Sequence, residues 1–248
     1  MPIPSPFHPR TLESNKALLW KDWGGYYAAR AYDPYFEREY YAFRHTAGMI
    51  DVTPLFKYEV YGPDATAFLT RIMSRNIGKL KQNQVTYCCW CDDEGKVVDD
   101  GTVSRFEENV YRVTAAEPTY AWFERYASEY DVTIEDSSAR FAALSIQGPN
   151  SRTILNQASD SSVDKLGFFR MMPAKVGGVP AIISRTGYTG DLGYEVWVEN
   201  QHALGLWDGL TVAGKNYGLA PAGLDAMDIT RVEAGFIMNG VDYYSANH

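Results

Sequence analysis

Two acidic positions on predicted strands are candidates for chemistry. Asp99 and Asp100 are adjacent within a predicted strand at 96–104, where Asp is unfavourable and successive side chains point to opposite faces. A carboxylate that faces the interior must be hydrogen-bonded or take part in binding or catalysis. The alternative is that both acids lie near a strand end in solvent. Glu195 lies among large apolar neighbours in a predicted strand at 193–199. Paired acids suit proton handling, or recognition of a ligand edge rich in N–H donors.

The order of predicted elements occurs twice along the chain. A strand near 57–61 runs into Gly-Pro-Asp at 62–64 and a helix, and a strand at 141–146 runs into Gly-Pro-Asn at 148–150 and a helix. We interpret this as duplication of a strand–helix–strands–helix unit, with two coincidental turns of common chemistry as the alternative. Two copies packed face to face would place a cleft near their pseudo-twofold axis.

The duplication would also place one acid in each half. Asp100 follows the turn residue Gly95 by five positions, and Glu195 follows Gly190 by the same interval. We therefore expect equivalent places for the two acids. The predicted fold class is α+β with mostly antiparallel sheet. The other predicted elements are a helix from Asp33-Pro34 to before Gly48, strands at 84–91, 109–114 and 179–185, and helices at 118–129 and 201–214.

Composition excludes several classes of protein. With 46 % hydrophobic and 22 % charged residues among 248, wholesale disorder is excluded. A net charge of −8 makes the chain a poor binder of nucleic acids and anionic membranes. No apolar run approaches the length of a membrane span, and the N-terminus has no apolar signal segment. We predict a soluble, cytoplasmic protein that binds neither nucleic acid nor membrane.

The three cysteines, Cys88, Cys89 and Cys91, lie within four residues of each other. An odd, tightly clustered set cannot build a disulfide framework, which favours a reducing compartment. A metal site would need a fourth ligand, and the four histidines have no matching spacing. We interpret the cysteines as small side chains of a strand and predict no metal.

Common nucleotide and hydrolase motifs are absent. Gly187, Gly190 and Gly193 recur every third residue, but a dinucleotide fingerprint has another spacing and opens a helix. These glycines lie between two strand-like stretches and predict a hairpin. The chain also lacks GxxxxGK[ST], GxSxG and HExxH.

Several motifs together resemble the folate-binding aminomethyltransferases, whose type member is the T-protein of the glycine cleavage system. They appear in family order from about residue 20 to the chain's end. The motifs are Asp51-Val52, Gly62-Pro63-Asp64-Ala65, Gly95-Lys96-Val97-Val98-Asp99-Asp100, Gln147-Gly148-Pro149, the run from Arg185 to Glu195, and Arg231-Val232-Glu233-Ala234-Gly235.

The resemblance implies tetrahydrofolate as cofactor and assigns site residues. Asp100 matches the family's catalytic aspartate, near N5 and N10 of the folate. Glu195 matches the pterin-binding glutamate, whose carboxylate can accept two parallel N–H bonds, and Tyr188 and Arg231 match further pterin-site residues. The remaining matches are residues that pack around the folate, with ordinary core packing as the alternative for the first three: Leu55, Tyr87, Tyr111 and Val113.

The implied reaction moves a one-carbon unit, aminomethyl or methyl, from an amine or methylated donor to N5 of tetrahydrofolate. The donor is a small molecule or is carried by a partner, such as a lipoyl carrier or a flavoprotein subunit. The family's Asp-Val-Ser-His-Met is here Asp51-Val52-Thr53-Pro54-Leu55, and its Ser-Asn-Ala is Thr114-Ala115-Ala116. The lost histidine and asparagine suggest a donor other than an aminomethyl-lipoyl arm.

The resemblance also implies a domain organisation. Residues 1–52 and 141–248 would form a folate-binding subdomain, and 53–140 a second, ferredoxin-like α+β subdomain. Family members continue into a small C-terminal β-barrel that is absent from this sequence, so we expect that the chain is a fragment, that another chain supplies the barrel, or that the barrel is missing. Two alternatives stay open: a non-catalytic folate-binding module, and the folate domain of an oxidative demethylase complex whose flavin subunit passes on formaldehyde.

Overall fold

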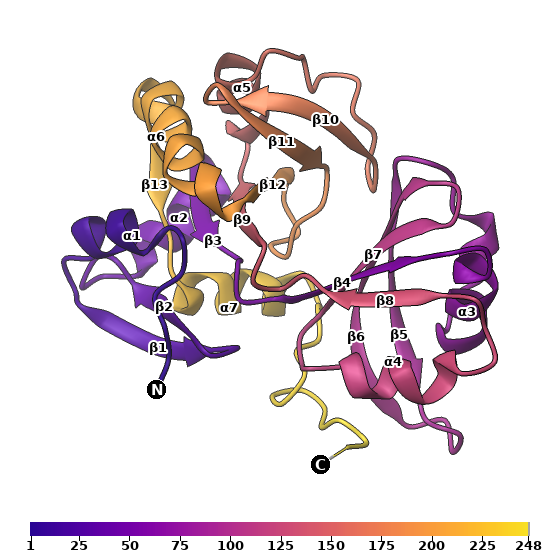
Figure 1. The fold of residues 1–248 in the computed structure, drawn as a ribbon. Helices are drawn as coiled ribbons and strands as arrows, with labels where there is room; N and C mark the ends of the chain where they lie inside the picture. The colour runs from indigo at the N-terminus through magenta and orange to yellow at the C-terminus, as the bar shows by residue number, and fades with distance from the viewer. Residues whose placement is uncertain (248) are drawn as a thin grey trace. The chain divides into compact units, whose positions relative to one another are not determined.

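The computed structural model describes residues 1–247, which divide into two compact units (Figure 1). Unit 1 comprises Met1–Pro54 and Arg140–Phe236, and unit 2 comprises Leu55–Ala139 together with the segment from residue 237 onward. The predicted boundaries at 52/53 and 140/141 lie within two residues of the observed ones. The last residues were expected in the folate-binding subdomain, and side chains of residues 239–245 hydrogen-bond to a strand of unit 2.

Unit 1 contains a six-stranded sheet in the order β10-β11-β12-β9-β3-β13, and a separate β1-β2 hairpin. All strand pairs are antiparallel except β3-β13. The strands are β1 Leu19–Trp23, β2 Tyr26–Ala31, β3 Ala47–Asp51, β9 Phe141–Gln147, β10 Met171–Val176, β11 Val179–Ser184, β12 Gly193–Glu199 and β13 Leu219–Pro221. The helices are α1 His8–Ser14, α2 Glu37–His45, α5 Ser151–Ala158, α6 Ala203–Gly214 and α7 Leu224–Glu233, with 3-10 turns η2 Asn200–His202 and η3 Lys215–Tyr217.

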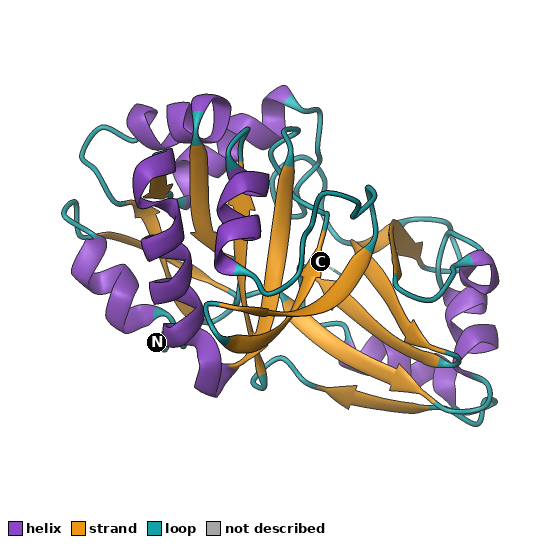
Figure 2. Ribbon diagram, turned by 90° about the horizontal axis from the view of Figure 1, so that it is seen from above, coloured by secondary structure: helices purple, strands orange, loops and turns teal. Residues whose placement is uncertain are grey.

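The core of unit 1 lies between its sheet and the helices α5 and α6. Leu155 of α5 and Trp207 and Leu210 of α6 are buried against Leu144 of β9 and Val196 of β12. These apolar side chains recur at helical spacing on α5 and α6 and at alternate positions on the strands, so each element buries one face. Figure 2 shows helices running beside the strands.

Unit 2 contains a five-stranded antiparallel sheet in the order β5-β6-β7-β4-β8. Phe68 of α3 and Phe123 of α4 are buried against Trp90, Tyr58 and Val103 of the sheet. The elements are β4 Phe56–Tyr61, α3 Ala65–Ile72, η1 Ile77–Lys79, β5 Gln84–Cys91, β6 Val97–Glu107, β7 Val110–Ala115, α4 Tyr120–Ala127 and β8 Thr133–Asp136.

The two units repeat one topology. β4-α3-β5-β6-β7-α4-β8 in unit 2 corresponds to β9-α5-β10-β11-β12-α6-β13 in unit 1, and the sheet orders agree except that β3 is inserted between β9 and β13. The turn glycines also match, since Gly62 and Gly148 have φ of +129° and +122°. The expected α+β fold and its duplication are confirmed.

The expected equivalence of the two acids is wrong. Asp100 lies on β6, whose counterpart is β11, whereas Glu195 lies on β12, whose counterpart is β7. The sequence reading omitted strand β10, which contains Pro173 and pairs only with β11 at the sheet edge. Proline lacks the N–H needed inside a ladder, and an edge strand tolerates this. The two carboxylates therefore come from different strands of the repeat.

Candidate functional site

Asp100 is fixed by two phenols of unit 2. Tyr87 on β5 donates a hydrogen bond of 2.9 Å to Oδ2 of Asp100, and Tyr243 donates a hydrogen bond to Oδ1. Burial, followed by the contact with the Asp100 carboxylate, raises the pKa of Tyr243 far above its ordinary value, so this phenol stays protonated. Each carboxylate oxygen thus has one O–H donor.

Asp99 faces the other way. Its side chain is 1 % exposed, and Oδ2 accepts hydrogen bonds from the backbone N–H groups of Ala116 (3.1 Å) and Glu117 (2.9 Å). Oδ1 accepts a hydrogen bond of 3.0 Å from the Asn239 side chain. Burial raises the pKa of Asp99 to about 6. Asp99 joins the loop after β7 to the C-terminal segment, so its role is structural.

The alternation of the strand explains why the two adjacent acids differ. In the β5-β6 register Trp90 pairs with Asp99 and Cys89 pairs with Asp100. Trp90 belongs to the core, so Asp100 projects from the opposite face. A Cβ at the next residue, Gly101, would lie 1.8 Å from the carbonyl oxygen of Thr114. Glycine therefore allows β6 and β7 to approach closely beside Asp100.

Glu195 occupies the middle of β12, between Ser145 on β9 and Ser184 on β11. Thr186 donates a hydrogen bond of 2.8 Å to Oε2 of Glu195, and its hydroxyl lies 2.7 Å from that of Ser184. Burial raises the pKa of Glu195, and the Thr186 hydrogen bond partly offsets this. Among the described residues Thr186 is its one side-chain hydrogen-bond partner.

The loop between β11 and β12 is shaped around the buried side chain of Gln147. Its Nε2 donates to the hydroxyl of Ser145 (2.9 Å) and the carbonyl of Thr186 (3.2 Å). A Cβ at Gly187 or Gly193 would lie 2.1 Å or 1.8 Å from Oε1 of Gln147. The hairpin predicted from the glycine spacing is therefore present, and two of its glycines make room for a glutamine.

Tyr188 and Arg231 are linked through Phe236. The rings of Tyr188 and Phe236 are stacked, with centroids 5.5 Å apart and planes 23° apart. The Arg231 guanidinium donates a hydrogen bond of 3.1 Å to the carbonyl of Phe236 and one of 2.8 Å to Asp228. Since the Arg231 side chain is only 2 % exposed, it acts as a support for the Phe236 turn and, through it, for Tyr188.

The predicted site residues fall into the two units. Tyr188, Glu195 and Arg231 belong to unit 1, with Tyr188 in the loop that leads to the Glu195 strand. Among the predicted site residues of unit 2, Tyr87 is the one with a side-chain hydrogen bond to Asp100 in the described part of the chain. The other three matched positions of unit 2 are Leu55, Tyr111 and Val113.

Tyr111 and Val113 pack in the core of unit 2. Both side chains are 0 % exposed, and the Tyr111 hydroxyl lies 2.6 Å from that of Thr66. Full burial favours core packing for both residues over folate contact. Leu55 is partly exposed, and its carbonyl accepts a hydrogen bond of 2.7 Å from Nζ of Lys57.

Two residues at the site escaped the sequence reading. Tyr243 and Asn239 reach the two adjacent acids from a segment that has no helical or strand periodicity, so no pattern in the sequence marked them. Ser245 fastens the same segment, since its hydroxyl donates a hydrogen bond of 2.6 Å to the carbonyl of Val98.

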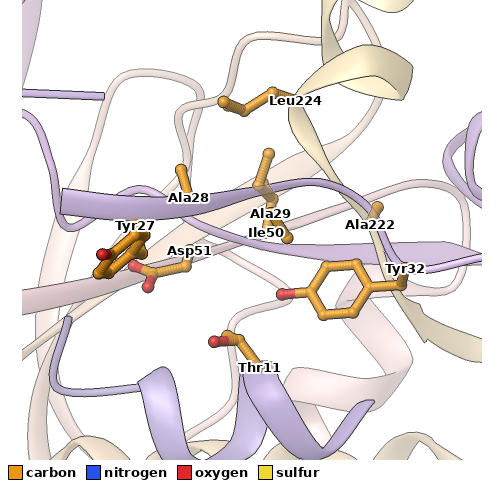
Figure 3. A pocket seen from close by; sticks show the side chains of 9 residues that line it. All are labelled: Thr11, Tyr27, Ala28, Ala29, Tyr32, Ile50, Asp51, Ala222 and Leu224. Atoms are coloured by element: carbon orange, nitrogen blue, oxygen red, sulfur yellow. The ribbon is translucent and has the colours of Figure 1, made fainter. Parts of the chain in front are cut away.

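A small cavity in unit 1 lies apart from these residues (Figure 3). The side chains of Thr11, Tyr32 and Asp51 line it together with small apolar groups. Its volume of about 10 Å³ has room for about one water molecule. Asp51 also accepts a hydrogen bond of 2.5 Å from Ser5.

The search for other kinds of site gave two negative results for residues 1–247. No cluster of three or more His, Cys, Asp or Glu side chains there could hold a metal ion. Across the same residues, no helix has both the length and the apolar character required to cross a membrane.

The sequence is similar to known proteins. The family model described as "GCVT N-terminal domain" matches residues 10–248. An aminomethyltransferase of Caldanaerobacter subterraneus subsp. tengcongensis is 41 % identical over 207 residues, covering 82 % of this chain and 55 % of that protein. A trimethylamine-oxide aldolase of Ruegeria pomeroyi is 36 % identical over 216 residues, covering 83 % of this chain and 27 % of that protein.

A solved structure shows the same fold. The glycine cleavage system aminomethyltransferase T from Bartonella henselae matches with a TM-score of 0.86 at 22 % identity, over 97 % of this chain and 64 % of that one. This chain spans little more than half the length of the curated aminomethyltransferases it matches.

Proposed function

The chain belongs to the family of the GCVT N-terminal domain, and from this premise we propose that it transfers a one-carbon unit from an amine or methylated donor to N5 of tetrahydrofolate. The observation that carries the proposal is the hydrogen bonding of Asp100. Phenols from β5 and from the C-terminal segment hold both of its oxygens. A carboxylate with a fixed orientation can offset cationic charge that develops on a one-carbon centre.

Tetrahydrofolate supplies the nucleophilic nitrogen that accepts the carbon, and residues of unit 1 fit its pterin. Glu195 is a half-buried residue whose Oε2 accepts from Thr186, and a carboxylate suits the N–H groups of an amino-pyrimidinone edge. Tyr188, stacked on Phe236, offers an aromatic surface to a flat ring. Arg231 keeps this pair in place from within the unit.

Asp100 has two tasks in this proposal. It orients the acceptor nitrogen, and it takes part in removing the proton that this nitrogen loses. A positioned proton-transfer or electrostatic group contributes about 10²–10⁴ in rate. Asp99 is not proposed for this role, because its oxygens are engaged by two backbone N–H groups and Asn239.

The donor is proposed to be an amine other than an aminomethyl-lipoyl arm. Pro54 and Ala115 stand where the family usually has a histidine and an asparagine, and the loss of these two polar side chains argues against the lipoyl-bound donor. The relatives' names, aminomethyltransferase and trimethylamine-oxide aldolase, both concern carbon bound to nitrogen. A flavoprotein subunit that delivers the carbon as formaldehyde is one form of such a donor.

The test is tetrahydrofolate-dependent transfer by the full-length protein, screened over methylated amines. Asp100→Asn should lower kcat by about 10²–10⁴ and leave folate affinity within a few-fold. Asp93→Asn removes an exposed acid of the same hairpin and should leave kcat unchanged. Equal activity of Asp100→Asn and the unmodified protein would refute the assignment of Asp100.

A further inference from the structure

Three side chains of β5 share one face of the sheet in unit 2. Tyr87, Cys89 and Cys91 alternate with Cys88 and Trp90, and the latter two belong to the core. The first three therefore project from the face that carries Asp100. All three cysteines are free thiols, and both Cys89 and Cys91 are partly exposed.

The Cys89 thiol is a direct neighbour of the proposed catalytic carboxylate. Cys89 and Asp100 are opposite each other in the β5-β6 register, which places their Cβ atoms about 5 Å apart. The Cys89 sulfur also lies 3.5 Å from the hydroxyl of Ser74. A nucleophile with hydrogen-bonding neighbours thus shares a sheet face with Asp100 and Tyr87.

Cys91 is the next residue after Cys89 on this face of β5, two positions along the strand. Burial first, and then the neighbouring Cys89, raise the pKa of Cys91. Cys91 therefore stays protonated at neutral pH and can donate its S–H. Residues two apart on a strand are separated by about 6.6 Å, near the upper limit for Cα atoms joined by a disulfide. An adduct with a small electrophile fits this pair better than a disulfide does.

We propose that Cys89, assisted by Cys91, captures formaldehyde as an S-hydroxymethyl adduct beside Asp100. The proposal rests on the proposed function, because a one-carbon unit at the oxidation level of formaldehyde is what the acceptor nitrogen takes up. The Cys89 sulfur forms a bond to the carbonyl carbon, the C=O π bond breaks, and the thiol proton ends on the oxygen. No oxidant or reductant is needed, and the reverse step returns formaldehyde for transfer.

The neighbours have defined parts in this adduct. Cys91 donates its S–H to the hydroxymethyl oxygen, and Asp100 accepts a hydrogen bond from the new hydroxyl group. Cys88 has no such part, since its buried sulfur lies 3.7 Å from that of Met73. Cys88 is therefore an internal control for thiol reactivity in the same strand.

The experiment is titration of the folded chain with carbon-13-labelled formaldehyde, followed by NMR of the S-hydroxymethyl carbon. We expect this signal in the unmodified protein and its loss in Cys89→Ser. Cys91→Ala should weaken the adduct several-fold, up to about tenfold for one lost hydrogen bond, and Cys91→Ser, which keeps a donor, should restore it. Cys88→Ala, confirmed as folded by circular dichroism, should behave as the unmodified protein does.

Two results would overturn the proposal: an undiminished signal in Cys89→Ser, or no signal in the folded protein at concentrations where glutathione shows one. Equal affinity in Cys91→Ala would refute the assisting role of Cys91. Because this titration contains no folate, its failure is distinct from failure of the proposed function. The proposed function is tested separately, by measuring the binding of tetrahydrofolate to the same samples.

Discussion

Tyr87 donates a hydrogen bond of 2.9 Å to Oδ2 of Asp100 across the β5-β6 pair. The second oxygen of the same carboxylate accepts from Tyr243, more than a hundred residues further along the chain. Both donors and the acceptor belong to unit 2. The orientation of the proposed catalytic group is therefore determined within one unit, by a strand neighbour and by a segment that follows the last helix.

Removing either phenol should slow transfer. Tyr87→Phe or Tyr243→Phe takes one donor from Asp100, and a hydrogen bond to a charged group contributes about 1.5–3 kcal/mol. We expect kcat to fall about 10- to 100-fold, with folate affinity changed little. Tyr244→Phe is a matched control, since Tyr244 is 76 % exposed. A normal kcat in both active-site variants would show that Asp100 does not depend on its phenols.

Asp99 should make stability fall as pH rises. Its pKa is raised from 3.8 to about 6 in the folded protein, so between these values the folded state binds the proton that the unfolded state has released. The free energy of unfolding then loses about 3 kcal/mol between about pH 4 and pH 7. Asp99→Asn carries no titrating group there. In urea titrations it should gain stability relative to the unmodified protein over this range, and a constant difference would contradict the account.

Variants of Arg231 and Phe236 should distinguish structural support of the site from contact with the folate. Arg231→Lys loses the forked geometry that joins Asp228 to the Phe236 carbonyl, and we expect about 1–3 kcal/mol lower free energy of unfolding. Phe236→Leu keeps that backbone contact and removes the ring stacked on Tyr188. It should weaken folate binding with a smaller loss of stability. Unchanged folate affinity in both variants would remove Tyr188 from the site.

Gly193 should tolerate no side chain. A Cβ there would lie 1.8 Å from Oε1 and 2.1 Å from Cδ of the buried Gln147. Gly193→Ala is expected to lower the free energy of unfolding by about 1–3 kcal/mol or more, measured by urea denaturation. Gly95→Ala tests the effect of the positive φ alone, since Gly95 has φ +80° and open space around its Cβ position. It should lower the free energy of unfolding by about 1 kcal/mol.

Much of the fold follows from sequence patterns that are local. The Gly-Pro-Asp and Gly-Pro-Asn turns predict a strand and a helix on either side, and their glycines do adopt matching positive φ at Gly62 and Gly148. The strand at 84–91 has its predicted bounds in β5. The duplication followed from these turns because each half buries its own core.

Helices and strands that depend on tertiary contacts rather than on local sequence patterns were not predicted or were placed at other residues. The helix expected from Asp33 begins at Glu37 instead, because the Asp33 carboxylate accepts the N–H of Tyr35 and the chain bends before the helix. The N-terminal α1, β1 and β2, the strand β3 inside the sheet of unit 1, the edge strands β8, β10 and β13, and α7 also went unpredicted.

Candidate site residues could be predicted where they match motifs. They could not be predicted where they come from a segment distant in the sequence. Asp100 and Glu195 stood out because acids within strands need partners. Tyr243 and Asn239 can be identified as partners of Asp100 and Asp99 only once residues 237–247 are known to lie on unit 2. Burial of Tyr111 likewise came from packing that periodicity does not specify.

The most direct test of the folate assignment is a titration of the protein with tetrahydrofolate, followed by tryptophan fluorescence. We expect quenching at micromolar concentration, about −8 kcal/mol of binding free energy, and its loss in Glu195→Ala. Glu199→Ala, which removes an exposed acid from the same strand, should bind as the unmodified protein does. Equal binding by Glu195→Ala, or no binding by folded full-length protein, would contradict the account.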